Sequence, residues 1–234
     1  MPETSAFRSV AESLDALDRS RFESLRGLTG ALLVVDVQHD FAAPEAIGHM
    51  CETPQDLQNV QDAVGQIHRL VDGARAAGVP VVWIQLETSH TSWTVNNWLR
   101  NGSRDIPLGE HNPCIKGTTG AQWYGGLAPA DGELVVSKDS YSGFIGTTLK
   151  ADLDQAGIDW VIVTGLTTEC CVHSTANDAM QHDFPVIVPS DACASYGTDF
   201  HDAALKSLAL NSSMVTTTDV VLSHLATSQQ QVSA

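Results

Sequence analysis

Three residues that lie far apart in the sequence have the types needed for covalent hydrolysis. They are Asp36, Lys138 and Cys171, and each falls at or just after the end of an apolar, β-branched run. A thiol can attack a carbonyl carbon, and a carboxylate can take its proton and return it to a leaving group. Alone, each residue has a simpler explanation, such as capping or solvation. Together they favour a thiol-dependent hydrolase.

The cysteine belongs to a segment that predicts a strand, a turn and a helix in succession. Residues 161–165 form an apolar, β-branched run, and the apolar residues downstream recur every three or four positions. Cys170 and Cys171 are therefore expected in the first helical turn, after an N-cap at Thr168 or Glu169. Unpaired backbone N–H groups and the helix dipole favour a thiolate there, as does a nearby Lys138. The alternative is that two small thiols simply pack in the core.

Strand-like and helix-like patterns alternate along the rest of the chain. The predicted strands cover residues 30–36, 80–86, 133–138, 161–165, 185–189 and 214–217, and the predicted helices cover 56–78, 146–157, the cysteine segment, 199–212 and 219–225. This alternation predicts an α/β fold with a mostly parallel, six-stranded sheet covered on both faces. Ligands bind beyond the carboxyl ends of such strands, so the three reactive residues are expected on one rim.

The pattern predicts a single folded domain at residues 30–226. Residues 1–29 are expected to be an N-terminal extension with helical potential, and residues 227–234 a polar tail. Residues 87–132 have no clean periodicity, and a long irregular insertion in a compact domain is typically functional.

Charge and composition narrow the possible function classes. The 28 acidic and 12 basic residues give a net charge of −16, which argues against nucleic acid or an anionic membrane as a partner. No apolar run approaches the roughly 18–20 residues that cross a bilayer, and no secretory signal is expected. The five cysteines include an adjacent pair and fit reduced thiols, so we expect a cytoplasmic protein.

Three motifs, in this order, resemble those of the isochorismatase-like cysteine hydrolases. They are residues 33–41, Lys138 with residues 141–144, and residues 165–172. The resemblance covers residues 28–222 and implies a three-layer α/β/α fold. It implies that Asp36 is the general base, Lys138 a polarising cation and Cys171, rather than Cys170, the nucleophile.

The resemblance also implies details of the site. It places a non-proline cis peptide at Leu166–Thr167 and an oxyanion hole at the backbone N–H groups of Thr167 and Cys171. The candidate substrate-binding residues are Phe41, Trp93, Tyr141, Phe144 and Glu169. Residues 141–144 resemble the branch that hydrolyses ureido and carbamoyl amides.

The sequence departs from the family pattern at three places. This chain has His39 where the family often has Asn, and Glu169 where the family often has Asp or Asn. In addition, residues 85–90 lack the Asp-x-His metal motif of nicotinamidases. None of the nine histidines has a convincing ligand spacing, so neither a metal nor another cofactor is expected.

These features predict an amidohydrolase that cleaves a small amide or ureide through a thioester and forms a homodimer or homotetramer. One alternative is isochorismate hydrolysis, a vinyl-ether cleavage that needs an acid but no thiol. The other is a catalytically silent binding protein on the same fold.

Overall fold

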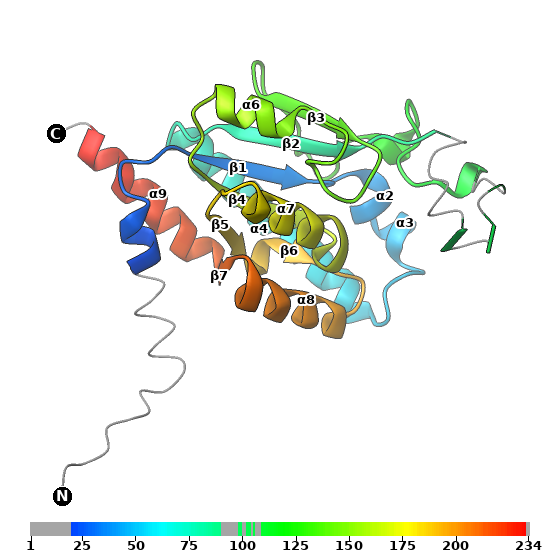
Figure 1. The fold of residues 1–234 in the computed structure, drawn as a ribbon. Coiled ribbons are helices and arrows are strands. Elements are labelled where there is room, and N and C mark those ends of the chain that lie inside the picture. Colours follow the sequence, from blue (N-terminus) through cyan, green and yellow to red (C-terminus); the bar gives the residue numbers. More distant parts are fainter. Residues whose placement is uncertain (1–19, 90–97, 100–101, 104, 106–108, 233–234) are drawn as a thin grey trace, which may run out of the picture.

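The computed structural model describes residues 20–89, 98–99, 102–103, 105 and 109–232, and it is built around a parallel sheet. The main strands are β1 (Gly30–Val35), β2 (Val81–Leu86), β3 (Leu134–Lys138), β4 (Trp160–Leu166), β5 (Val186–Pro189) and β7 (Met214–Thr216). Their order is β3-β2-β1-β4-β5-β7, as Figure 1 shows. The six predicted strands are confirmed. A short additional strand, β6 (Cys193–Ala194), pairs with the end of β4.

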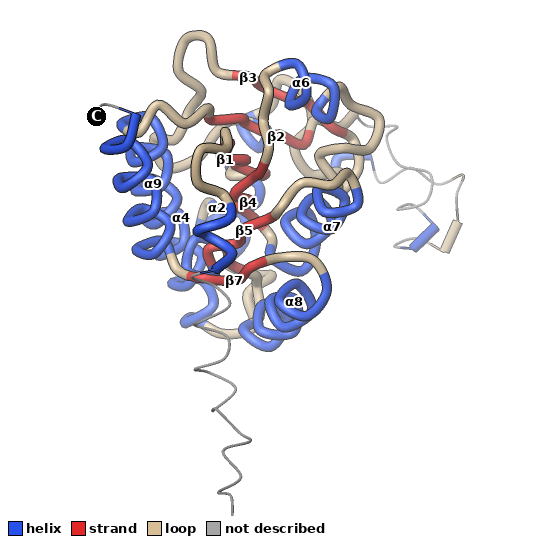
Figure 2. Tube along the Cα trace, turned by 60° about the vertical axis from the view of Figure 1, so that its left-hand side comes forward, coloured by secondary structure: helices blue, strands red, loops and turns tan. Residues whose placement is uncertain are grey.

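Helices cover both faces of the sheet. α4 (Pro54–Ala76) and α9 (Thr218–Val232) lie on one face, and α6 (Leu149–Gln155), α7 (His173–Gln181) and α8 (Thr198–Asn211) lie on the other (Figure 2). The predicted three-layer α/β/α fold is therefore confirmed. Within the described ranges, no helix has an apolar stretch long enough to cross a membrane.

Alternation along the central strand explains the two hydrophobic layers. In β1, Leu32 and Val34 pack toward α4 and α9, whereas Leu33 and Val35 pack toward α6 and α7. Every residue of β1 is buried, as expected of a strand covered on both faces. The long helix α4 begins with a capping box formed by Thr53 and Asp56, which satisfies backbone donors at its first turn.

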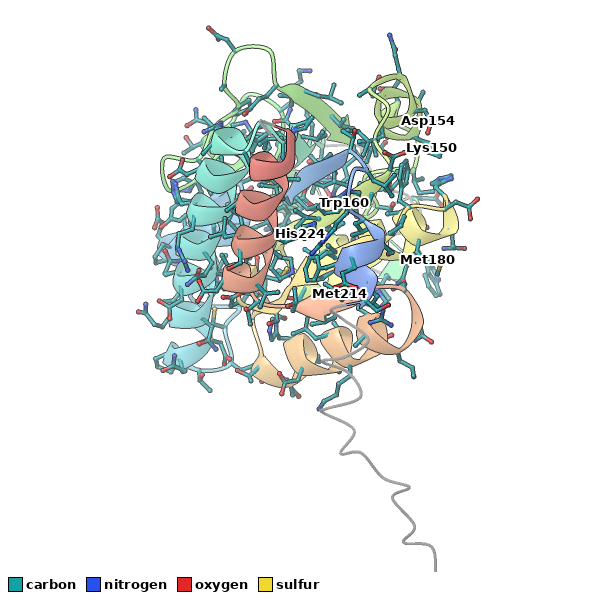
Figure 3. All side chains as sticks on the ribbon, turned by 90° about the vertical axis from the view of Figure 1, so that its left-hand side faces the viewer. Lys150, Asp154, Trp160, Met180, Met214 and His224 are labelled. Carbon is teal, nitrogen blue, oxygen red and sulfur yellow. The ribbon has the colours of Figure 1, made fainter. Side chains whose placement is uncertain are left out.

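The chain termini differ in part from the predicted boundaries. α9 continues to Val232, beyond the predicted end at residue 225, because no Gly or Pro interrupts this polar stretch. Its described side chains are held against the domain by contacts such as Trp160 with His224, whose ring centroids are 5.8 Å apart (Figure 3). At the other terminus, residues 20–24 are helical and residues 25–29 form a turn that leads into β1, whereas residues 1–19 of the predicted extension lie outside the described residues.

Short helices and turns follow β1 and also lie in the insertion of residues 87–132. α2 (His39–Ala42) and α3 (Pro44–Ile47) follow β1, and the turns η1 (Gly109–His111) and η2 (Thr119–Ala121) lie in the described part of the insertion. Gln38 forms an isolated bridge with Trp123, so this part of the insertion lies beside the carboxyl end of β1.

Candidate active site

The structure brings Asp36, Lys138 and Cys171 together at the carboxyl ends of three strands. Asp36 follows β1, Lys138 ends β3, and Cys171 lies in the π-helical turn η3 (Thr168–Val172) after β4. Lys138 Nζ donates to Asp36 Oδ2 at 2.7 Å and lies 3.5 Å from Cys171 Sγ. The side chains of Asp36 and Lys138 are completely buried. The predicted convergence on one rim is therefore observed.

Sheet order explains why a lysine can reach both partners. β1 pairs with β2 on one side and with β4 on the other, so it lies at the point where the chain changes direction across the sheet. Ligand sites of open α/β sheets lie at such switch points. Lys138 pairs in register with Leu86 of β2, and its long side chain reaches across to Asp36. Its ammonium group also donates to the carbonyl of Ser140 at 2.9 Å.

Two unusual backbone conformations lie side by side at this rim. Gly165 has a φ of 127° and pairs with Val35, and an added Cβ would collide with the Val35 carbonyl oxygen. Asp36 has a φ of 51°, in the left-handed region that Asp tolerates better than most residues. The close approach of β1 and β4 therefore requires glycine at 165.

The turn that carries the cysteine begins one residue earlier than the sequence predicts. Thr167 is the N-cap, rather than Thr168 or Glu169, because its backbone is extended and its carbonyl accepts hydrogen bonds from the N–H groups of Cys170 and Val172. Its hydroxyl donates to Glu169 Oε1 at 2.8 Å. The predicted non-proline cis peptide is present between Leu166 and Thr167.

The buried ion pair sets the protonation of the site. Burial raises the pKa of Asp36, and the charge of Lys138 opposes this shift only in part. Within the described part of the chain, Asp36 Oδ1 has no hydrogen-bond partner. Burial alone would lower the pKa of Lys138, but Asp36 and Cys171 raise it, so the lysine remains charged. Asp36 is therefore a stronger base than an exposed carboxylate.

The protonation of Cys171 differs from the sequence-based expectation of a thiolate. A hydrogen bond with Cys170, burial and the charge of Asp36 raise the pKa of Cys171 well above its ordinary value. Lys138 opposes this effect, but its charge is already paired with Asp36. The resting site therefore holds a thiol, and a reaction at sulfur needs a base.

The candidate substrate-binding residues lie in different surroundings. Phe41 is partly buried on α2, and its carbonyl accepts a hydrogen bond from the Tyr196 hydroxyl at 3.1 Å. Glu169 and Tyr141 are exposed. Phe144 is buried in the core, with its ring centroid 6.4 Å from that of Phe184.

Trp93 lies outside the described residues. The roles of all five candidate residues in substrate binding stay predictions.

Three residues that were not among the predicted site residues also help to build the site. Gln38 is buried, and its amide group bonds to both backbone groups of Leu86 and to the carbonyl of Ala121. It thereby ties the end of β2 and the turn η2 to the segment after Asp36. Its place within the first motif was a usable signal.

Cys114 and Tyr196 are the other two residues. Burial and the charges of Asp36 and Asp40 raise the pKa of Cys114, which shows that this third thiol lies near the site. Tyr196 is close enough for the charges of Glu169 and Cys171 to raise its pKa, although burial is the larger cause. No sequence pattern marks either residue.

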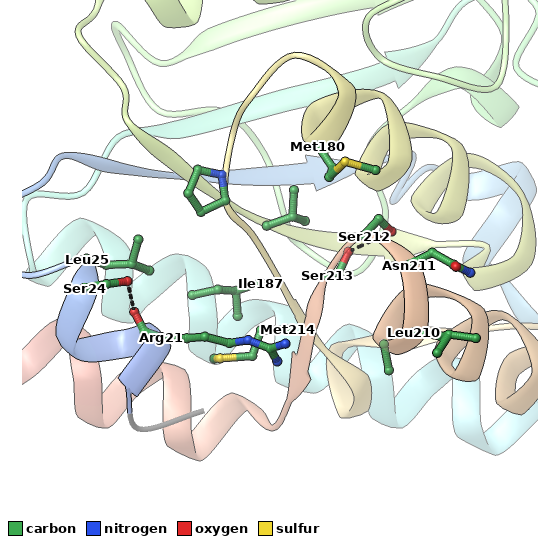
Figure 4. Close-up of a pocket in the computed structure, with 13 residues that line it drawn as sticks. Arg21, Ser24, Leu25, Met180, Ile187, Leu210, Asn211, Ser212, Ser213 and Met214 are labelled. Atoms are coloured by element: carbon green, nitrogen blue, oxygen red, sulfur yellow. Dashed lines mark hydrogen bonds between the residues drawn. The ribbon is translucent and has the colours of Figure 1, made fainter. Parts of the chain in front are cut away.

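The described part of the site has no cluster of metal ligands, and a cavity at the other end of the sheet is separate from it. Among the described residues, no three His, Cys, Asp or Glu side chains are grouped as metal ligands. A cavity of about 310 Å³ opens near the amino ends of β5 and β7, beside Arg21, Met180 and Met214 (Figure 4). None of the three reactive residues lines that cavity.

Known proteins resemble this chain in sequence and in fold. The model of the isochorismatase domain matches residues 30–220. The ureidoacrylate amidohydrolase RutB of Methylobacterium radiotolerans is 32% identical over 191 residues, which cover 77% of this chain and 73% of that protein. An Arabidopsis thaliana protein described as a probable inactive nicotinamidase is 30% identical over 175 residues, covering 74% of this chain and 84% of the relative.

A solved structure extends the comparison to three dimensions. The N-carbamoylsarcosine amidase of Thermoplasma acidophilum matches with a TM-score of 0.63 and 26% identity, covering 82% of this chain and 98% of that chain. The residues matched by the isochorismatase family model make up most of the chain, and Asp36, Lys138 and Cys171 lie within that range. The chain therefore belongs to the isochorismatase-like cysteine hydrolase family.

Proposed function

We propose that this protein is an amidohydrolase that cleaves a C–N bond of a small amide or ureide through a thioester intermediate. The observation that carries the proposal is the contact of one buried ammonium group, that of Lys138, with both a carboxylate and a thiol. Asp36 is the general base, Cys171 the nucleophile and Lys138 the cation that holds the other two in place.

In the first half-reaction, the thiol proton of Cys171 passes to Asp36 as the sulfur–carbon bond forms. The carbonyl oxygen becomes an oxyanion, for which the N–H groups of Thr167 and Cys171 are the proposed donors. As the oxyanion collapses, the C–N bond breaks, and Asp36 returns the proton to the departing nitrogen. The products of this step are an acyl-enzyme and free ammonia or amine.

In the second half-reaction, water replaces the amine. Asp36 takes a proton from the attacking water, and the C–S bond breaks as the second tetrahedral intermediate collapses. The proton returns to sulfur, which restores the thiol. The raised pKa of Asp36 supports this assignment, because a more basic carboxylate transfers protons more effectively near neutral pH.

The names of two relatives support an amide substrate. Ureidoacrylate amidohydrolase and N-carbamoylsarcosine amidase are both named as enzymes that act on amides. The relative described as inactive favours the second candidate, a catalytically silent binding protein on the same fold. The small-molecule partner, the homo-oligomeric state and the cytoplasmic location are further parts of the proposal.

The test is ammonia release from a panel of primary amides and ureides. We expect Cys171→Ala to reduce turnover of the best substrate by about 10⁴-fold. Cys51→Ala is the matched control, because Cys51 is a partly buried free cysteine outside the proposed machinery. Full turnover by Cys171→Ala would refute the proposed nucleophile.

Inactivity of the wild type toward the whole panel would favour the other candidates. Isochorismate is then the next substrate to assay, because the vinyl-ether reaction needs no thiol. Hydrolysis of isochorismate by both the wild type and Cys171→Ala would identify the vinyl-ether activity, and no reaction at all would favour the silent protein.

A further inference from the structure

Gln38 is completely buried at the place where β1 stops pairing with β2. β1 ends at Val35, and the backbone turns away at Asp36, whose φ is 51°. The Asp36 N–H group still donates to the carbonyl of Ile84 at 2.8 Å. Further along β2, the N–H and C=O groups of Leu86 face the side where β1 no longer runs. Buried backbone groups of this kind need another partner.

The amide group of Gln38 takes the place of the missing strand. Its Oε1 accepts a hydrogen bond from the Leu86 N–H group at 2.8 Å, and its Nε2 donates to the Leu86 carbonyl at 2.9 Å. Nε2 also donates to the carbonyl of Ala121 at 2.9 Å. Since one of these partners is a donor and two are acceptors, only one orientation of the amide satisfies them all. Gln38 Oε1 is therefore fixed on the Leu86 N–H group.

The carboxylate of Asp36 lies beside the same N–H group. Burial is the main cause of the raised pKa of Asp36, and the backbone N–H of Leu86 is among the smaller causes that oppose it. The hydrogen bond of this N–H goes to Gln38, however, and Asp36 Oδ1 has no hydrogen-bond partner among the described residues. A full hydrogen bond from a backbone N–H would stabilise the carboxylate and make it a weaker base.

The charged neighbours of Asp36 do not depend on Gln38. Among the described residues, the titratable side chains that face Asp36 are Lys138 from β3, Cys171 from η3 and Cys114 from the insertion. Lys138 donates to Asp36 Oδ2, so Oδ1 is the oxygen that is open to a further hydrogen bond. A substitution at position 38 therefore changes the backbone donor near Asp36 and leaves these charges in place.

We propose that Gln38 is a positioning residue for the general base, because it holds the Leu86 N–H group away from the Asp36 carboxylate. Oδ1 of Asp36 is thereby kept free to take a proton from the thiol or from water. The assignment of Asp36 as the base rests on the proposed function. The competition of Gln38 and Asp36 for one N–H group does not depend on turnover.

The experiment is an NMR titration of the Asp36 carboxyl carbon in the full-length protein, with its signal assigned by its loss in Asp36→Asn. Gln38→Met has a side chain of similar length that cannot accept a hydrogen bond from an amide. We expect it to move the titration midpoint of Asp36 toward acid by about one pH unit, because the Leu86 N–H group then donates to Oδ1.

Two further variants separate this effect from a general loosening of the site. Gln38→Glu keeps an oxygen that accepts from Leu86, and we expect no acid shift of the Asp36 midpoint. It also tests the proposal if Gln38→Met does not fold. Thr88→Val is the matched control, because it removes the 2.6 Å hydrogen bond to Pro113 that attaches the insertion to the end of β2. It leaves the bonds of Gln38 intact, so the midpoint should stay unchanged.

Three results would overturn the inference. They are an unchanged midpoint in folded Gln38→Met, an acid shift in Gln38→Glu, and an equal acid shift in Thr88→Val. If the proposed function is correct, the acid limb of kcat/KM against pH should move with the midpoint in Gln38→Met. Expected midpoints in a protein that hydrolyses no amide would count against the proposed function and would still establish the effect of Gln38 on Asp36.

Discussion

The two ends of β3 carry ion pairs that differ mainly in burial. At the carboxyl end, Lys138 pairs with Asp36 at 2.7 Å, and both side chains are 0% exposed. Just before the amino end, Glu133 receives two hydrogen bonds from Arg75 and one from the indole of Trp83. There the arginine is 36% exposed and the glutamate 14%.

Burial gives these two pairs opposite protonation behaviour. The pKa of Asp36 is raised because desolvation outweighs the attraction of Lys138. The pKa of Glu133 is lowered to about 2 because the hydrogen bond from Arg75 outweighs a smaller desolvation. Pairing with a cation therefore accompanies a more basic carboxylate, Asp36, at one end of the strand and a less basic carboxylate, Glu133, at the other.

The largest expected effect is that of Asp36→Asn on catalysis. We expect a loss of turnover of about 10²–10⁴-fold, because the amide cannot act as the general base. We expect faster alkylation of Cys171 by iodoacetamide at neutral pH in the same variant, since Lys138 would no longer be neutralised by a carboxylate. Slower alkylation of Cys171 in Asp36→Asn, together with full turnover, would show that Asp36 is neither the base nor the group that neutralises Lys138.

The next effect concerns stability at the buried end. Lys138→Met leaves the Asp36 carboxylate buried without a cation, and we expect it to lower the unfolding free energy by about 3 kcal/mol. The double variant Asp36→Asn/Lys138→Met should recover much of that loss, because neither charge remains. Urea unfolding measures both. A double variant that is less stable than the single one would show that the pair itself stabilises the fold.

A smaller effect is expected at the other end of the strand. Glu133→Gln should lower the unfolding free energy by about 1–2 kcal/mol and leave turnover unchanged. The matched control is Glu87→Gln, which breaks an ion pair of 2.7 Å whose lysine, Lys116, is 74% exposed. We expect at most about 0.5 kcal/mol there. Equal losses of unfolding free energy in the two variants would show that neither burial nor the hydrogen bond from Trp83 strengthens the Glu133 pair.

The smallest expected effect is a change with pH. The pKa of Glu133 falls from an ordinary 4.5 to about 2 in the folded protein, so its stabilisation is complete above about pH 4.5. It is lost as the pH falls from there toward 2. The stability difference between wild type and Glu133→Gln should therefore shrink over this range, measured by urea unfolding at each pH. A stability difference that stays constant over this pH range would show that the pKa of Glu133 is not lower in the folded than in the unfolded protein.

The strand ends were predictable from the sequence, and with them the meeting of three distant residues. Asp36, Lys138 and Cys171 each follow a buried run, and parallel strands bring their carboxyl ends to one rim. Local patterning therefore sufficed for the fold and for the reactive groups. The choice of Cys171 over Cys170 came from family resemblance.

The protonation of the thiol could not be predicted, because it depends on which charges are already paired. A sequence shows that Lys138 is available, but not that Asp36 neutralises it or that both are completely buried. Tyr196 was missed for a related reason. Its hydroxyl bonds to the carbonyl of Phe41, which is 155 residues distant, and no local pattern marks such a contact.

The position of β1 between β2 and β4 also bears on how the chain folds. The bond from Lys138 to Asp36 joins residues that are 102 positions apart, and Cys171 follows β4, which pairs with the other side of β1. Contacts of such long range form late, because chain entropy must be lost before they are made. A nascent chain that ends at β3 has the carboxylate and the ammonium group but not yet Cys171. Recovery of turnover during refolding is therefore a stringent report of completed assembly.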